Sequence, residues 1–96
     1  MALSFEWDPR KDRSNKRKHG ISFKEAQTVF FDENARFMGD PDHSEAENRF
    51  LILGLSSKLR TLIVCHCYRA ADTVIRVISA RRAIKNERAL YEERIK

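Results

Sequence analysis

Three arginines in the C-terminal half lie inside or at the ends of apolar runs that have the composition of β-strands: Arg69, Arg76 and Arg81. We expect Arg69 to end one strand, Arg76 to lie within the next strand, and Arg81 to begin the last helix, so that the three side chains converge on one edge of a sheet. The planar guanidinium group binds phosphate oxygens through two parallel hydrogen bonds. Cations held in this way stabilise charge that develops in a transition state. The spacing therefore predicts a catalytic phosphate site.

Two further residues, His66 and Glu47, have side chains suited to proton transfer. His66 is the one histidine inside an apolar run, and histidine changes its charge near neutral pH. The alternative is a hydrogen-bonded histidine in the core. Glu47 precedes Arg49 at the start of a predicted strand and is the other possible base, although a solvated strand end would give the same pattern. With cations nearby, such a base would allow the 2′-hydroxyl of RNA to attack its own phosphate, and no cofactor would be needed.

Positive charge is concentrated in two parts of the chain, which has 96 residues and a formal net charge of +5. Residues 10–19 contain six lysines and arginines and one acid, Asp12, while residues 49–82 are rich in arginine, beginning with Arg49. This distribution favours a phosphate-rich partner such as RNA, and a simply solvated basic helix is the alternative. Tyr68 could stack on a base of that partner.

The two cysteines, Cys65 and Cys67, flank His66 in an apolar run. On a strand the cysteines would share one face and the histidine would point to the other. The triplet therefore does not gather three metal ligands on one face, and no second ligand pair occurs elsewhere in the sequence. We expect two reduced thiols and no metal site.

Capping and periodicity signals divide the N-terminal half into a strand and two helices. Alternating apolar residues predict a strand over residues 3–7. An aspartate followed by proline is typical of a helix start and a later glycine of a helix end, which predicts a helix over residues 9–19. A Ser-x-x-Glu capping box at residues 22–25 begins a second helix that packs on the core, and a brief strand is expected over residues 35–38.

The C-terminal half reads as a sheet followed by a helix. Apolar runs at residues 50–55, 59–68 and 74–80 predict three adjacent strands of an antiparallel meander. An amphipathic helix is expected from Arg81 onward. The fold class is therefore α+β, with an N-terminal strand and two helices followed by an antiparallel sheet and a C-terminal helix, in a single domain over residues 1–96. Neither an export signal nor a membrane span is recognisable, so we expect a cytoplasmic protein.

Several short motifs occur in the order and spacing of a known family. They are Phe5-Glu6-Trp7-Asp8, Lys18-His19-Gly20-Ile21-x-Phe23 with Ala26 and Val29-Phe30, His66-Cys67-Tyr68-Arg69, and Ile75-Arg76-Val77-Ile78-Ser79-Ala80-Arg81. In these segments the chain resembles the BrnT toxin family, from about residue 5 to Tyr91. The run from Arg76 to Arg81 is the most distinctive part of the likeness.

The resemblance implies a ribonuclease toxin of a type II toxin-antitoxin module, with a RelE-like fold, that inhibits translation by cleaving RNA without a metal. It also implies a BrnA antitoxin with a ribbon-helix-helix segment, so that operon DNA would be bound only through the antitoxin. The polar residues that match the family motifs are Lys18, His19, Arg69, Arg76, Ser79 and Arg81. We accordingly expect RNA contacts from Lys18, His19, Arg49, Tyr68 and Ser79, and catalysis from His66, Arg69, Arg76, Arg81 and Glu47.

Two other functions fit the same composition. A non-catalytic module could hold RNA, DNA or an acidic partner protein on the basic surface, and its binding would depend steeply on salt without any cleavage products. A structural subunit could instead pair its arginines with the acids of a cognate chain, and RNA would then add nothing to the complex.

Overall fold

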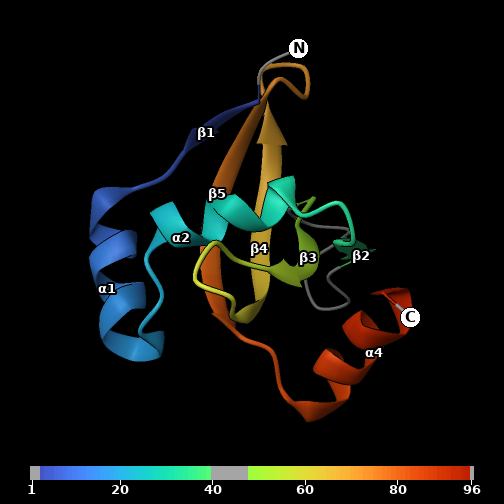
Figure 1. The fold of residues 1–96 in the computed structure, drawn as a ribbon. Coiled ribbons are helices and arrows are strands. Elements are labelled where there is room, and N and C mark those ends of the chain that lie inside the picture. Colours follow the sequence, from blue (N-terminus) through green and yellow to red (C-terminus); the bar gives the residue numbers. More distant parts are fainter. Residues whose placement is uncertain (1–2, 40–47, 96) are drawn as a thin grey trace.

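The computed structural model describes residues 3–39 and 48–95 of the chain. In these residues a five-stranded sheet has the order β1-β5-β4-β3-β2, in which β1 runs parallel to β5 and the other neighbours are antiparallel. The elements are β1 (Ser4–Glu6), α1 (Pro9–His19), α2 (Phe23–Gln27), η1 (Thr28–Phe31), β2 (Arg36–Gly39), β3 (Phe50–Leu55), β4 (Thr61–Arg69), β5 (Val74–Arg82) and α4 (Lys85–Ile95). Helices α1 and α2 lie beside the sheet, and α4 lies at the end away from the β4–β5 turn (Figure 1).

The first helix begins and ends where its capping residues predict. The Asp8 side chain accepts a hydrogen bond from the backbone N–H of Arg10, Pro9 opens the first turn, and Gly20 takes a left-handed conformation with φ of 71°. The N–H of Gly20 donates to the carbonyl oxygen of Lys16 at 2.9 Å. The predicted helix over residues 9–19 is therefore confirmed.

The second helix is shorter than an ordinary helix because it tightens after one turn. Ser22 caps it by accepting a hydrogen bond from the N–H of Glu25 at 3.0 Å. After Gln27 the chain continues as the 3-10 helix η1. Gly54 of β3 lies under η1, where an added Cβ would come within 2.9 Å of the Val29 side chain. A glycine at this position therefore lets η1 approach the sheet closely.

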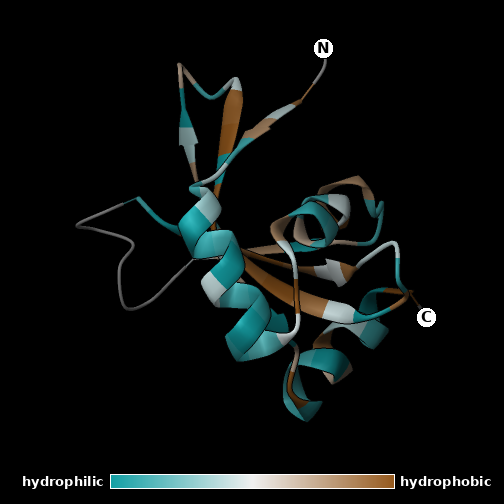
Figure 2. Cartoon of the chain, turned by 90° about the vertical axis from the view of Figure 1, so that its left-hand side faces the viewer, coloured by the Kyte–Doolittle hydropathy of each residue, from teal (hydrophilic) through white to brown (hydrophobic). Residues whose placement is uncertain are grey.

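The sheet is covered by apolar side chains on both faces. One face meets α2 and η1 in a core built from Ile21, Phe23, Ala26, Val29, Ile52, Leu62, Val64, Val77 and Ala80. The other face meets α4 in a smaller core of Leu53, Ile63, Ala83 and Tyr91. Figure 2 shows α1 as hydrophilic along most of its length, with hydrophobic strands behind it. Of the residues of α1, Asn15 alone is buried, so the helix packs against the rest of the fold through very few side chains.

The α+β class is confirmed, and three predicted details are wrong. The sheet is mixed rather than antiparallel, because β1 pairs in parallel with β5. β4 begins at Thr61 rather than at residue 59, since Leu59 has a positive φ of 61° in the preceding turn. Arg81 does not open the last helix, because it continues the β5 ladder opposite Ile63, and α4 begins at Lys85. Backbone pairing with β4 extends β5 to Arg82, beyond residue 80, where the predicted apolar run ends.

Candidate functional site

The position of α1 is fixed by one buried side chain, Asn15. β1 pairs with β5 only as far as Arg76, so among the described residues no strand lies beside the later part of β5 on that edge. Asn15 takes the place of a strand there: its Nδ2 donates to the carbonyl oxygens of Ala80 and Ile21, both at 2.8 Å, and its Oδ1 accepts from the N–H of Ala80 at 3.1 Å. The polar helix is therefore held against β5 by hydrogen bonds rather than by apolar contact.

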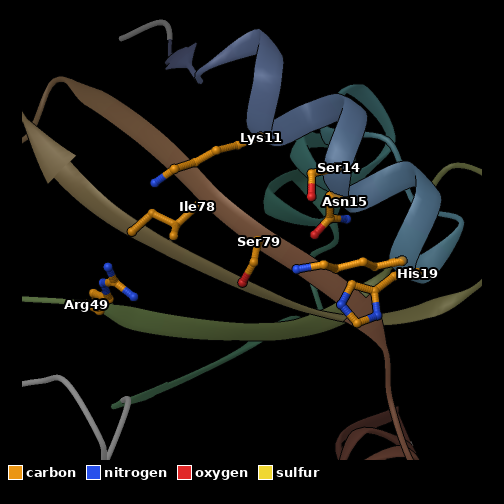
Figure 3. A pocket seen from close by; sticks show the side chains of 8 residues that line it. Lys11, Ser14, Asn15, His19, Arg49, Ile78 and Ser79 are labelled. Atoms are coloured by element: carbon orange, nitrogen blue, oxygen red, sulfur yellow. The ribbon is translucent and has the colours of Figure 1, made fainter.

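A basic pocket of about 270 Å³ lies between α1, β5 and the start of β3 (Figure 3). Its lining residues are Lys11, Ser14, Asn15, Lys18 and His19 of α1, Ile78 and Ser79 of β5, and Arg49. The side chains of Lys11 and Arg49 approach it from opposite sides, and in this view the Ser79 side chain of β5 lies between α1 and β3 (Figure 3). This arrangement brings together four of the five residues expected to contact RNA.

The chemistry of this basic pocket is that of an anion site. Lys11, Lys18 and Arg49 supply positive charge, Ser79 supplies a hydroxyl group and His19 supplies an imidazole that can exchange a proton. Ammonium and guanidinium groups around one hydroxyl suit the oxygens of a phosphate. Lys11 and Ser14 were not predicted as site residues, although their spacing from Lys18 places all three on one side of a helix.

A second cationic group lies further along the sheet, on the side of Ser79. Glu6 Oε2 accepts from Arg76 at 2.7 Å and lies 3.3 Å from Arg69 Nε. Arg76 pairs with Cys67 and Ser79 pairs with Cys65, so Arg76 and Ser79 share a face although they are three residues apart. The β-bulge opposite Cys65 causes this, because an extra residue in β5 reverses the alternation of its side chains.

Arg81 does not join the other two arginines, and the predicted convergence of all three on one edge is wrong. It lies five residues after Arg76 on the same strand, a separation of roughly 16 Å at the ordinary rise of about 3.3 Å per residue. Its guanidinium group forms two hydrogen bonds with Glu87 of α4, at 2.8 and 2.9 Å. This contact raises the pKa of Arg81 and lowers that of Glu87.

His66 is fully buried, with a relative exposure of 0%. Its ring packs edge-on against Phe30 and Tyr68 at centroid distances of 4.7 and 5.3 Å. Nδ1 lies 3.2 Å from the carbonyl oxygen of Val64, so it carries the proton, and Nε2 can accept from the Tyr68 hydroxyl at 3.4 Å. Burial lowers the pKa of His66, although the hydrogen bond to Val64 acts in the opposite direction. In this structure His66 is a neutral residue without access to solvent.

The remaining predictions concern Tyr68, Glu47 and the cysteines. Tyr68 is half-buried beside Phe50, away from the basic pocket. Glu47 lies outside the described residues. Cys65 is buried and Cys67 half-buried, and neither forms a disulfide.

Within residues 3–39 and 48–95, no three His, Cys, Asp or Glu side chains gather as metal ligands. No helix in that part of the chain is long and apolar enough to cross a membrane.

The mixed sheet and the basic pocket define a small α+β protein with a surface suited to phosphate. Residues 7–87 match the family described as the ribonuclease toxin BrnT of type II toxin-antitoxin systems, and the chain belongs to this family. The fold is similar to that of the Brucella abortus ribonuclease toxin BrnT, with a TM-score of 0.68 over 88% of this chain and 100% of that chain, at 21% identity. No curated protein sequence matches the chain.

Proposed function

We propose that this chain is a metal-independent endoribonuclease toxin that cleaves RNA in the cytoplasm and thereby inhibits translation. The basic pocket carries the proposal, because it gathers Lys11, Lys18, His19, Arg49 and Ser79 around a space of about 270 Å³. Membership of a family of ribonuclease toxins supports the same substrate class. We also propose that the α+β fold is of the RelE-like type.

In the proposed reaction, the pocket holds the phosphate that is to be cleaved. Lys11, Lys18 and Arg49 offset its charge, and Ser79 donates a hydrogen bond to one of its oxygens. As the 2′-oxygen forms its bond to phosphorus, negative charge grows on the non-bridging oxygens and the cations bind more strongly. The P–O5′ bond then breaks, leaving a 2′,3′-cyclic phosphate on one product and a 5′-hydroxyl on the other.

Proton transfer in this reaction needs one group to remove the 2′-hydroxyl proton and one to protonate the leaving 5′-oxygen. His19 is the histidine in the pocket, and we assign it one of these two steps. Glu47 remains a proposed partner for the other step. The full burial of His66 keeps its ring away from RNA, so its proposed role is to hold Tyr68 in place.

Arg69 and Arg76 extend the proposed RNA path from the basic pocket along the sheet. Glu6 holds both side chains, and an approaching phosphate can replace this carboxylate as their partner. Arg81 is already engaged by Glu87 of α4, and an RNA contact there would require that ion pair to open. Glu87 holds Arg81 by two hydrogen bonds and is less exposed than Glu6, at 21% against 38%, so we propose that Arg69 and Arg76 contribute more to RNA binding than Arg81 does.

The proposed partner is a BrnA-type antitoxin with a ribbon-helix-helix segment, which would silence the toxin and connect it to operon DNA. Support for an antitoxin comes from the family, whose members belong to type II toxin-antitoxin systems. The basic pocket adds a physical reason, because acidic side chains of an antitoxin could occupy the sites that phosphates would otherwise fill.

The test is RNA cleavage by the purified chain in the presence of a metal chelator. We expect fragments with 2′,3′-cyclic phosphate ends, and a loss of activity in Lys18→Ala, Arg49→Ala and His19→Gln variants that remain folded. Lys85→Ala removes a lysine that does not line the basic pocket and should leave the rate unchanged. Salt-sensitive RNA binding without any cleavage would instead identify a binding module, and activity that requires an added metal would refute metal independence.

A further inference from the structure

A second cavity, of about 480 Å³, lies where β3 begins and β4 extends beyond it. The described residues that line it are Asn48, Phe50, Tyr68 and Asp72. Its size is within the range of sites that bind small organic molecules. The mixture of two aromatic rings, an amide and a carboxylate differs from the cationic lining of the basic pocket.

The aromatic rings of this cavity are held in fixed positions. Phe50 and Tyr68 have ring centroids 5.5 Å apart at an interplanar angle of 56°. Behind them, His66 contacts both rings, at 6.3 Å from Phe50 and 5.3 Å from Tyr68, and accepts a hydrogen bond from the Tyr68 hydroxyl. Phe50 is 37% exposed, so part of its ring faces solvent. An exposed aromatic ring with a buried support is the usual platform for an unpaired base.

Two polar side chains of the cavity, those of Asn48 and Asp72, could form hydrogen bonds with a ligand. Within the described residues, the side chains of Asn48 and Asp72 have no hydrogen bond or ion pair to another residue. Burial raises the pKa of the Tyr68 hydroxyl, and the negative charge of nearby Asp72 raises it further. A carboxylate beside an aromatic ring can accept two parallel hydrogen bonds from a stacked ligand. Guanine alone among the RNA bases has two adjacent donors, N1–H and N2–H, on its Watson–Crick edge.

We propose that the cavity lined by Asn48, Phe50, Tyr68 and Asp72 binds an unpaired guanine base of the RNA substrate. The base stacks on an aromatic ring, Asp72 accepts from its N1–H and N2–H groups, and the Asn48 amide donates to O6. This inference rests on the proposed ribonuclease function and adds a base preference to it. The family and its fold do not supply that preference.

The two pockets lie on either side of a single short segment of chain. Arg49 lines the basic pocket, while its neighbours Asn48 and Phe50 line the second cavity. Asn48 has a positive φ of 50°, so the chain turns there, immediately before β3 begins, and the three neighbouring side chains reach different pockets. An RNA strand with a phosphate at Arg49 therefore passes next to the entrance of the guanine pocket. The base bound there belongs to a nucleotide close to the cleaved bond.

Cleavage of matched RNAs tests this proposal. The substrates are single-stranded oligonucleotides that are identical except for G, A, C or U at one position near the mapped cut. We expect the G-containing RNA to be cleaved at least about tenfold faster, the discrimination typical of one well-formed pair of hydrogen bonds to a base. Asp72→Asn should remove most of this preference, measured as the ratio of the rate on the G-containing RNA to the mean rate on the other three. Asparagine accepts the left-handed conformation that Asp72 adopts, with φ of 68°, so this variant should fold.

Binding measurements separate this proposal from the nuclease function. Guanosine, which has no phosphate, is added to the ¹⁵N-labelled protein, and the amide signals of Asn48 and Tyr68 are followed, with adenosine as the comparison ligand. Glu33→Gln, an exposed acid outside the cavity, is the matched control for Asp72→Asn. Guanosine-specific shifts that disappear in Asp72→Asn support the guanine pocket, even if the chain cleaves no RNA and the nuclease function fails. Cleavage with equal rates on all four RNAs, or shifts that are the same for both nucleosides, would overturn the pocket and leave the nuclease function standing.

Discussion

At the scale of single residues, burial decides which polar side chains can take part in chemistry. His66 and His19 have the same functional group, but His66 is fully buried among aromatic rings and His19 lines an open pocket. Glu6 and Glu25 differ in a similar way. Glu6 is partly exposed between two arginines of the sheet, whereas Glu25 is buried in an ion pair with Arg60 and a hydrogen bond with Ser56. In each pair the buried residue, His66 or Glu25, supports the structure. The exposed residue, His19 or Glu6, lies where a substrate could reach it.

His66 should make the protein less stable as the pH falls. Burial holds its pKa below the ordinary value of 6.5, so the unfolded state binds a proton near that pH before the folded state does. The free energy of unfolding should therefore decrease from about pH 7.5 to about pH 5.5. Urea denaturation at several pH values measures this, and His66→Gln should flatten the curve in that range. A slope in His66→Gln that equals the wild-type slope would contradict the assignment.

At the scale of elements, two side chains attach helices to the rest of the fold. Asn15 attaches α1 to the edge of β5, and Tyr91 attaches α4 to the other face by donating to Asp32 at 2.6 Å. The burial of Tyr91 and its hydrogen bond to Asp32 raise its pKa to about 12. Asp32 also accepts from the N–H of Leu55 at 2.8 Å, which joins η1, β3 and α4 at one carboxylate.

Asn15→Ala should destabilise the fold by about 2 to 4 kcal/mol, because it leaves the buried N–H and carbonyl groups of Ala80 without partners. Ser14→Ala, at the neighbouring position of α1, is the control and should change the free energy of unfolding by less than about 0.5 kcal/mol. Urea denaturation of both variants measures the difference. Equal stability of the two variants would mean that α1 is held by other contacts.

The ion pair between Arg81 and Glu87 provides a test of whether Arg81 acts in structure or in catalysis. If it joins β5 to α4, Arg81→Met and Glu87→Gln should cause the same small loss of stability, below about 1 kcal/mol because both side chains are partly exposed. RNA cleavage by both variants should then stay close to the wild-type rate. A catalytic role would appear as a large loss of activity in Arg81→Met alone. Denaturation and cleavage rates measured on the same preparations distinguish the two outcomes.

At the scale of the whole molecule, several positively charged side chains lie along a route that crosses the basic pocket. It runs from α1 through the basic pocket to Arg69 and Arg76 on the sheet, while Arg81 is held by α4 at the other end. The positions of the charged side chains therefore say more about the binding partner than the net charge of +5 does. A surface of this kind attracts a polyanion from a distance and orients it before close contacts form.

RNA binding should become weaker as salt increases, and the slope should report which residues contact phosphates. Replacing Lys18 or Arg49 by alanine should reduce the slope of log K against log salt by about 0.7 for each lost contact with a single strand. Lys85→Ala should leave the slope unchanged, since Lys85 does not line the basic pocket. The measurement uses a non-cleavable RNA analogue at several salt concentrations. Equal slopes in all four proteins would place the RNA elsewhere.

Much of the local structure could be predicted from the sequence. The ends of α1 are set by Asp8, Pro9 and Gly20, which lie within a few residues of the backbone groups they satisfy. The strands β3 and β5 follow from apolar runs in the same way. The basic character of α1 and the α+β class were predicted for the same reason, because each depends on composition or on contacts between near neighbours.

Only the tertiary structure decided how these elements meet. Asn15 reaches Ala80 across 65 residues, the bulge opposite Cys65 brings Ser79 and Arg76 to one face, and the β4 ladder carries Arg81 past its expected helix. The parallel pairing of β1 with β5 joins segments from opposite ends of the chain. Such contacts leave no periodic pattern, because they depend on which backbone groups remain unpaired after the sheet has formed. The sequence by itself determined the elements and the charge of this protein, and the long-range hydrogen bonds determined its pockets.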